Sequence, residues 1–148
     1  MTFHQLPLET HLQRLQSPSG KVRMVLDTDT YNEIDDQFAV VYALLSPDEL
    51  DVAAIYAAPF HNNRSSDAGD GMERSYEEIL RLLDRLGGDF KSDGFVFRGS
   101  TAFMADREHP VESEAAQHLI DLALASKDEP LYVVAIGAPT NVSSAIMM

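Results

Sequence analysis

The fold of this chain is decided by the stretch Val22-Arg23-Met24-Val25-Leu26-Asp27-Thr28-Asp29-Thr30-Tyr31-Asn32-Glu33-Ile34-Asp35-Asp36. It joins an apolar run, typical of a buried strand, to ten residues (27–36) that carry four aspartates and one glutamate. Carboxylates gathered at one strand end repel one another unless a cation or a polar ligand relieves the repulsion. In an open α/β sheet, ligands bind outside the carboxyl ends of the strands. The stretch therefore predicts a site for a divalent metal ion and a polyol.

Apolar segments and segments of helical spacing alternate along the rest of the chain. This alternation predicts right-handed crossovers and the fold class α/β, an open, mostly parallel sheet with flanking helices. The expected strands are 21–26, 51–58, 95–97 and 131–136, and the expected helices are 35–46, 72–86 and 111–125.

Two of these helices have a recognisable apolar face. In the first, the apolar residues are Phe38, Val41, Tyr42 and Leu45, at spacings i, i+3, i+4 and i+7. In the second, they are Ile79, Leu82, Leu83 and Leu86, and Gly87-Gly88 ends the helix. The polar, glycine-bearing segment 60–71 between them is predicted to be a loop.

The domain is expected to span residues 21–148, with residues 1–20 as a polar lead-in. A new helix begins after Asn141, close to the last residue, Met148. A parallel sheet that stops there has an uncovered edge and an uncovered apolar face. We therefore expect an α/β domain that is incomplete at its C-terminus, and we expect a homo-oligomer.

Composition narrows the class of protein. The chain has 148 residues, 45% of them hydrophobic, and it has no cysteine, so disulfides and thiolate metal sites are excluded. A formal charge of −13 argues against binding to nucleic-acid phosphates. No apolar run approaches the roughly 18 residues of a membrane span, and no signal-peptide pattern is present. We expect a cytoplasmic protein that does not bind nucleic acid or membrane.

The aspartate-rich stretch resembles the nucleoside hydrolases, the inosine/uridine-preferring family of N-ribohydrolases. Their signature is a similar aspartate-rich segment at the end of the first strand. The segment Val133-Val134-Ala135-Ile136-Gly137-Ala138-Pro139-Thr140-Asn141 is similar to the family's strand that ends in Gly-Pro-Leu-Thr-Asn, and Phe97-Arg98-Gly99 is a weaker third match. Thr30–Ile34 replaces a shorter Pro-Gly turn of the family. The resemblance covers about the first half of the family's domain.

The resemblance implies calcium-dependent hydrolysis of the N-glycosidic bond of a ribonucleoside, giving ribose and a free base. By motif position, Asp29 would be the general base and would also touch the metal. The other implied roles are ribose hydroxyl binding by Asp35, Ca²⁺ ligation by Asp36 and by the Thr140 carbonyl, support by Asp27, and contact with ribose or water by Asn62 (or Asn63). The family's general-acid histidine comes from a later portion of its domain, and no histidine of this sequence matches it.

The residue types suit this chemistry in their own right. Ca²⁺ takes six to eight hard oxygen ligands, and carboxylates with a carbonyl provide such oxygens. Carboxylates also stabilise the positive charge that develops on a sugar ring during glycoside hydrolysis.

Two other interpretations remain open. A truncated or degenerate domain would bind ribose and calcium without turnover. A phosphatase of the haloacid dehalogenase type would use Asp27 as nucleophile and Asp29 as acid/base around magnesium, and Gly88-Asp89-Phe90-Lys91-Ser92-Asp93 resembles the later motif of that class.

Overall fold

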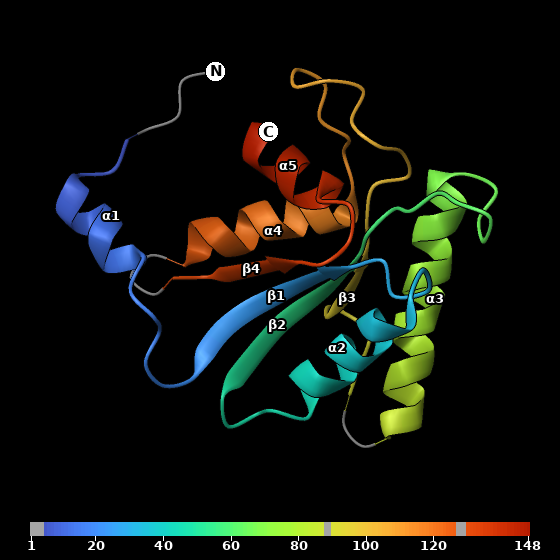
Figure 1. Cartoon of the computed structure of the whole chain (residues 1–148), viewed down its shortest axis with the longest axis horizontal. Helices are drawn as coiled ribbons and strands as arrows, with labels where there is room; N and C mark the ends of the chain where they lie inside the picture. The colour runs from blue at the N-terminus through green and yellow to red at the C-terminus, as the bar shows by residue number, and fades with distance from the viewer. Residues whose placement is uncertain (1–4, 88–89, 127–129) are drawn as a thin grey trace.

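Four parallel strands form the centre of the described part of the molecule in the computed structural model, which describes residues 5–87, 90–126 and 130–148 (Figure 1). They are β1 (Val22–Thr28), β2 (Leu50–Ala57), β3 (Val96–Arg98) and β4 (Tyr132–Ala135). Their order in the sheet is β3-β2-β1-β4, so the aspartate-rich stretch leaves one of the two central strands. The predicted α/β class with a parallel sheet is confirmed.

Helices cover both faces of the sheet (Figure 1). They are α2 (Ile34–Leu44) and α3 (Ala68–Leu86) on one face, with α4 (Glu114–Ala125) and α5 (Thr140–Met147) on the other. Successive side chains of a strand point to opposite faces of the sheet. Strand β1 therefore contributes Met24 and Leu26 to the apolar core on the side of α2 and α3, and Val25 to the apolar core on the side of α4 and α5. Both faces of β1 are therefore buried, as its continuous apolar run predicts.

Three elements differ from the sequence prediction. Helix α4 begins at Glu114 instead of residue 111, because the Ser113 hydroxyl accepts a hydrogen bond from the Ala116 amide at 3.1 Å and caps the helix. A helix, α1 (Leu8–Arg14), lies within the expected lead-in, and none of its side chains is buried. Helix α3 begins at Ala68 instead of residue 72, because the Asp67 carboxylate accepts a hydrogen bond from the Asp70 amide at 2.8 Å and caps the helix. Gly87 ends α3 with a φ of 66°, as expected, and Gly88 lies outside the described residues.

The apolar face predicted for α2 is wrong at three of its four positions, because Phe38, Tyr42 and Leu45 are exposed, whereas Val41 packs against the core as predicted. The side chains that face the core are Val40, Ala43 and Leu44, whereas Phe38 is 69% exposed and Tyr42 is 72% exposed. The rotation of the helix follows from Asp36, which accepts a hydrogen bond from the Thr28 hydroxyl at the end of β1. Val40 and Leu44 follow Asp36 by one and two helical turns, so they face the core when Asp36 lies against the end of β1. Phe38 and Tyr42 then face outward.

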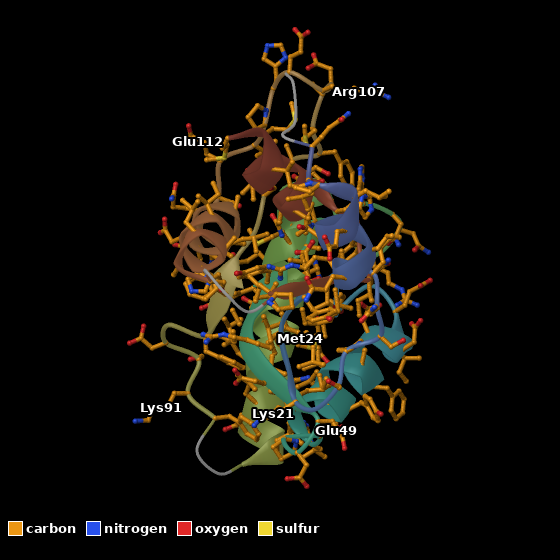
Figure 2. The ribbon with its side chains drawn as sticks, turned by 90° about the vertical axis from the view of Figure 1, so that its left-hand side faces the viewer. Lys21, Met24, Glu49, Lys91, Arg107 and Glu112 are labelled. Atoms are coloured by element: carbon orange, nitrogen blue, oxygen red, sulfur yellow. The ribbon has the colours of Figure 1, made fainter. Side chains whose placement is uncertain are left out.

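Figure 2 relates the two ends of the sheet to the rest of the molecule. Lys21 and Glu49, which precede β1 and β2, lie together at the lower end, and the Val22 amide donates to the Glu49 carbonyl at 2.8 Å. The segment with Arg107 and Glu112, which follows the carboxyl end of β3, lies at the upper end. The acidic stretch therefore lies at the opposite end of β1 from Lys21.

Strand β4 is an edge of the sheet. It pairs with β1 on one side, and within the described ranges no strand pairs with its other side. Val133, Val134 and Ile136 are exposed in consequence, which confirms the expected open apolar edge. Among the residues described here, no helix combines the length and the apolar character needed to span a membrane.

Candidate functional site

The carboxyl end of β1 is unusually polar for a buried segment. Asp27, Thr28, Asp29 and Thr30 are all buried, and Asp27 has no exposed surface. Asn141 donates a hydrogen bond to Asp27 Oδ1 at 2.8 Å, whereas Asp27 Oδ2 has no hydrogen-bond partner. Burial raises the pKa of Asp27 to about 7; the Asn141 hydrogen bond opposes that rise, and the negative charge of Asp29 adds to it.

Asn141 joins the ends of three strands. Its side chain is fully buried, and its Nδ2 donates to the carbonyl of Ala57 at 3.2 Å as well as to Asp27. Its Oδ1 accepts from the Ser100 amide at 2.7 Å and from the Ser100 hydroxyl at 2.9 Å. Asn141, at the start of α5, thus holds together the ends of β1 and β2 and the segment that follows β3.

This junction requires a glycine at position 99. A Cβ there would lie 1.9 Å from the Ala57 carbonyl oxygen and 2.4 Å from Asn141 Nδ2, and real Cβ contacts are never that short. The sequence prediction quoted Gly99 and Asn141 as parts of motifs but gave neither a role, and it gave none to Ser100. The available signal was weak: Ser100 follows the end of β3 by two residues, and Asn141 follows the end of β4 by six.

Asp36 approaches the same strand end from the first turn of α2. Its carboxylate is buried and accepts a hydrogen bond from the Thr28 hydroxyl at 2.6 Å, and that hydroxyl also lies 3.0 Å from the Thr30 hydroxyl. Burial raises the pKa of Asp36, the Thr28 hydrogen bond opposes the rise, and the charges of Asp29, Asp35 and Glu33 add to it. Asp35, one residue earlier, is exposed to solvent.

Asp29 lies between β1 and the turn that follows β4. Its Oδ2 accepts a hydrogen bond from Asn32 Nδ2 at 3.0 Å. Its Oδ1 lies against Gly137, where an added Cβ would come within 2.7 Å of that oxygen. Burial raises the pKa of Asp29, the Asn32 hydrogen bond opposes the rise, and the charges of Glu33 and Asp35 add to it. The turn that leads to Thr140 therefore contacts the predicted general base.

The structure thus brings some of the predicted site residues to the end of β1 and leaves others exposed and farther away. Asp29 and Asp36 are both buried at the end of β1 and repel each other, and the buried Thr140 begins α5 beside Asn141. Asn62 is exposed and reaches Asp29 only through Asn32, to which its Nδ2 donates at 2.6 Å. Asn32 has no predicted role, because it belongs to the loop that has no counterpart in the resembled motif.

The donor set fits a hard cation such as Ca²⁺, although it is incomplete. Within 5–87, 90–126 and 130–148, no three His, Asp or Glu side chains are grouped so as to hold a metal ion. The carboxylates of Asp29 and Asp36 and the carbonyl of Thr140 are the oxygen types that Ca²⁺ prefers, and Asp29 Oδ1 lies against Gly137, which has no side chain. Water or substrate hydroxyls would have to supply the other ligands.

Two of the described histidines, His118 and His109, have partners outside this site. His118 Nδ1 pairs with the Tyr56 hydroxyl at 2.9 Å, and its ring stacks on Phe97 with centroids 4.0 Å apart. Burial lowers the pKa of His118. His109 is exposed and pairs with Asp106.

Burial also argues against the phosphatase interpretation. A nucleophile must contact its substrate, and Asp27 has no exposed surface, with one carboxylate oxygen held by Asn141. The later motif expected for that class, residues 88–93, lies partly outside the described residues.

One family model matches the chain. Residues 23–148 match the family described as "Cellulose-binding Sde182, nucleoside hydrolase-like domain". No curated protein and no solved structure matches the chain. The match supports the nucleoside-hydrolase-like fold predicted from the aspartate-rich stretch, but it does not extend to the narrower inosine/uridine-preferring enzyme family.

Proposed function

Because the chain belongs to the family of the Sde182 nucleoside hydrolase-like domain, we propose that its acidic site binds Ca²⁺ together with the sugar of a ribonucleoside and hydrolyses the N-glycosidic bond. The observation that carries this proposal is the pairing of Asp29 and Asp36. Both carboxylates are buried at one strand end, and each has its pKa raised, first by burial and further by neighbouring negative charges. A bound divalent cation would relieve that repulsion.

Each residue has a distinct part in the proposed reaction. Asp29, Asp36 and the Thr140 carbonyl would hold the cation, which, when bound, supplies Lewis-acid chemistry and keeps nearby carboxylates ionised. Asp29 accepts a proton from the attacking water as the new C–O bond forms at the anomeric carbon and the C–N bond breaks. Asp35 is exposed beside the pair, so it is free to accept hydrogen bonds from sugar hydroxyls. The departing base takes up a proton from solvent or from a group outside this site.

A second candidate function is sugar and calcium binding without turnover. His118 and His109 are paired with Tyr56 and Asp106, so neither is placed to act as a general acid for the leaving base. The matched family is also described by cellulose binding rather than by catalysis. Both candidates share the cation and the sugar contacts, and only bond cleavage separates them.

Calorimetry of Ca²⁺ binding, followed by an assay of inosine and uridine cleavage, tests the proposal. The key variant is Asp36→Asn, which keeps the shape of the side chain and removes its charge, and the matched control is Asp84→Asn on the exposed side of α3. We expect Asp36→Asn to lose Ca²⁺ binding and turnover, and Asp84→Asn to retain both. Ca²⁺ and ribose binding without cleavage would favour the second candidate. Absence of Ca²⁺ binding in the unaltered protein would overturn both.

A further inference from the structure

The loop between β1 and α2 is held at several points over the acidic site. The Asn32 amide donates to the Asp29 carbonyl at 2.7 Å, and the Arg64 guanidinium donates to the Asn32 carbonyl. The Tyr31 ring stacks on the Phe60 ring, and the two centroids are 6.4 Å apart. Phe60 and Arg64 both belong to the loop after β2, so that loop contacts the loop between β1 and α2 at two points. The backbone of Asn32 is therefore fixed relative to Asp29.

The side chains in this region form a chain of hydrogen bonds with one possible direction. The Arg64 backbone amide can only donate, and it donates to Asn62 Oδ1 at 2.9 Å. The other end of that side chain is therefore the Asn62 amide nitrogen, which donates to Asn32 Oδ1 at 2.6 Å. Asn32 must in turn present its amide nitrogen to Asp29 Oδ2, at 3.0 Å. The orientation of both asparagines is thus set by a main-chain donor.

This arrangement gives the two oxygens of Asp29 different surroundings. Oδ2 is occupied by a donor from Asn32, and Oδ1 packs against Gly137, in the turn between β4 and α5, where an added Cβ would come within 2.7 Å of it. A carboxylate that is held by a side-chain donor at one oxygen and packed against a turn at the other has a fixed orientation. Outer partners of this kind orient metal-binding carboxylates in known sites.

We propose that Asn32 is a positioning residue for Asp29, and that Asn62 acts through Asn32 by fixing the direction in which it donates. The inference rests on the proposed function for what Asp29 Oδ1 receives, which would be the cation. The hydrogen-bond chain itself is independent of that function. It assigns a role to the loop Thr30–Ile34, which is longer than the turn in the resembled family.

A double-mutant cycle tests this proposal. The variants are Asn32→Ala, Asn62→Ala and the double variant, with Asn63→Ala as the control because Asn63 is the exposed neighbour outside the chain of hydrogen bonds. We expect Asn32→Ala to weaken Ca²⁺ binding by about ten-fold or more, as for other outer partners of metal ligands. Asn62→Ala should weaken binding in the unaltered protein and add nothing in the Asn32→Ala background, whereas Asn63→Ala should have no effect.

The same cycle is read in the calcium-free protein from the ¹³C NMR shift of the Asp29 carboxyl carbon at a fixed pH. Asn62→Ala should move this signal only when Asn32 is present. Equal effects of Asn62→Ala in both backgrounds would overturn the proposal, because Asn62 would then act independently of Asn32. If the unaltered protein binds no Ca²⁺, the proposed function fails, and the NMR cycle alone decides whether Asn32 positions Asp29.

Discussion

The two sides of strand β1 differ sharply in how they are buried. Toward β2 and β3, the strand ends are joined by a buried polar network centred on Asn141, in which nearly every group has a partner. Toward β4, the sheet ends in an edge with Val133 and Val134 exposed, and Asp29 Oδ1 faces a glycine instead of a side chain. The comparison indicates that the network fixes the ends of β1 and β2, whereas on the β4 side the Asp29 carboxylate is packed against a turn that carries no side chain at Gly137.

Removing Asn141 should have the largest effect on stability, because it lies on the network side. Asn141→Ala would leave the Ser100 amide and the Ala57 carbonyl without their partner in a buried place, at a cost of about 3–5 kcal/mol in the free energy of unfolding. Urea unfolding followed by circular dichroism measures this. Asn63→Ala should stay within about 0.5 kcal/mol of the unaltered protein. Similar midpoints for the two variants would mean that the network does not hold the strand ends.

The raised pKa of Asp27 should be visible in the pH dependence of the free energy of unfolding. Its pKa is about 7 in the folded protein against the ordinary value of 3.8, so the folded protein retains a proton that the unfolded chain has released. Its stabilising contribution is therefore complete below pH 3.8 and is lost as the pH rises through 7. The loss amounts to as much as about 4 kcal/mol. Asp27→Asn should flatten the measured dependence in calcium-free buffer, and an unchanged slope would contradict the assignment.

Two glycine substitutions should show that the two sides of β1 have different roles, one in stability and the other in Ca²⁺ binding. In Gly99→Ala the new methyl group meets main-chain oxygen of Ala57, so we expect a loss of about 2–3 kcal/mol of stability. In Gly137→Ala the methyl group meets the Asp29 carboxylate oxygen at 2.7 Å and the Asp29 amide nitrogen at 3.0 Å, a milder main-chain contact than at Gly99, so stability should fall less and Ca²⁺ binding should fall more. Thermal unfolding and calorimetry on the same samples test this contrast. The reverse order of the two effects would contradict it.

The smallest expected effect concerns the outward stripe of α2. Phe38→Ser should change stability by no more than about 0.5 kcal/mol, because the side chain is already exposed. Val40→Ala, two residues along and fully buried, should cost about 2 kcal/mol. Paired urea unfolding curves measure the difference. A larger cost at Phe38 would show that the helix packs with the face that its periodicity suggested.

The fold could be predicted from sequence because each strand is a local apolar run. The run 22–26 and the alternation of strands with helices were enough to give a parallel sheet. The face of α2 could not be found in the same way. Periodicity identifies an apolar stripe on a helix, but it does not say which stripe faces the core. In α2 the rotation is set by a polar contact between Thr28 and Asp36, which lie eight residues apart.

The site was predictable only in part. The aspartates that cluster locally were identified, because their density is visible within ten residues. The contacts of Asn141 join residues 41, 84 and 114 positions apart, and no local pattern contains that information. Asn62 was given a sugar contact without its link to Asn32, because that pairing depends on how two loops 30 residues apart fold over Asp29.

A crystal structure of the protein with Ca²⁺ tests the central claim most directly. We expect a single strong site at the carboxyl end of β1, with oxygens of Asp29, Asp36 and the Thr140 carbonyl about 2.3–2.6 Å from the ion. Water or sugar hydroxyls should complete the coordination. An ion bound at other carboxylates, or none at millimolar Ca²⁺, would contradict the claim that these three groups form one cation site.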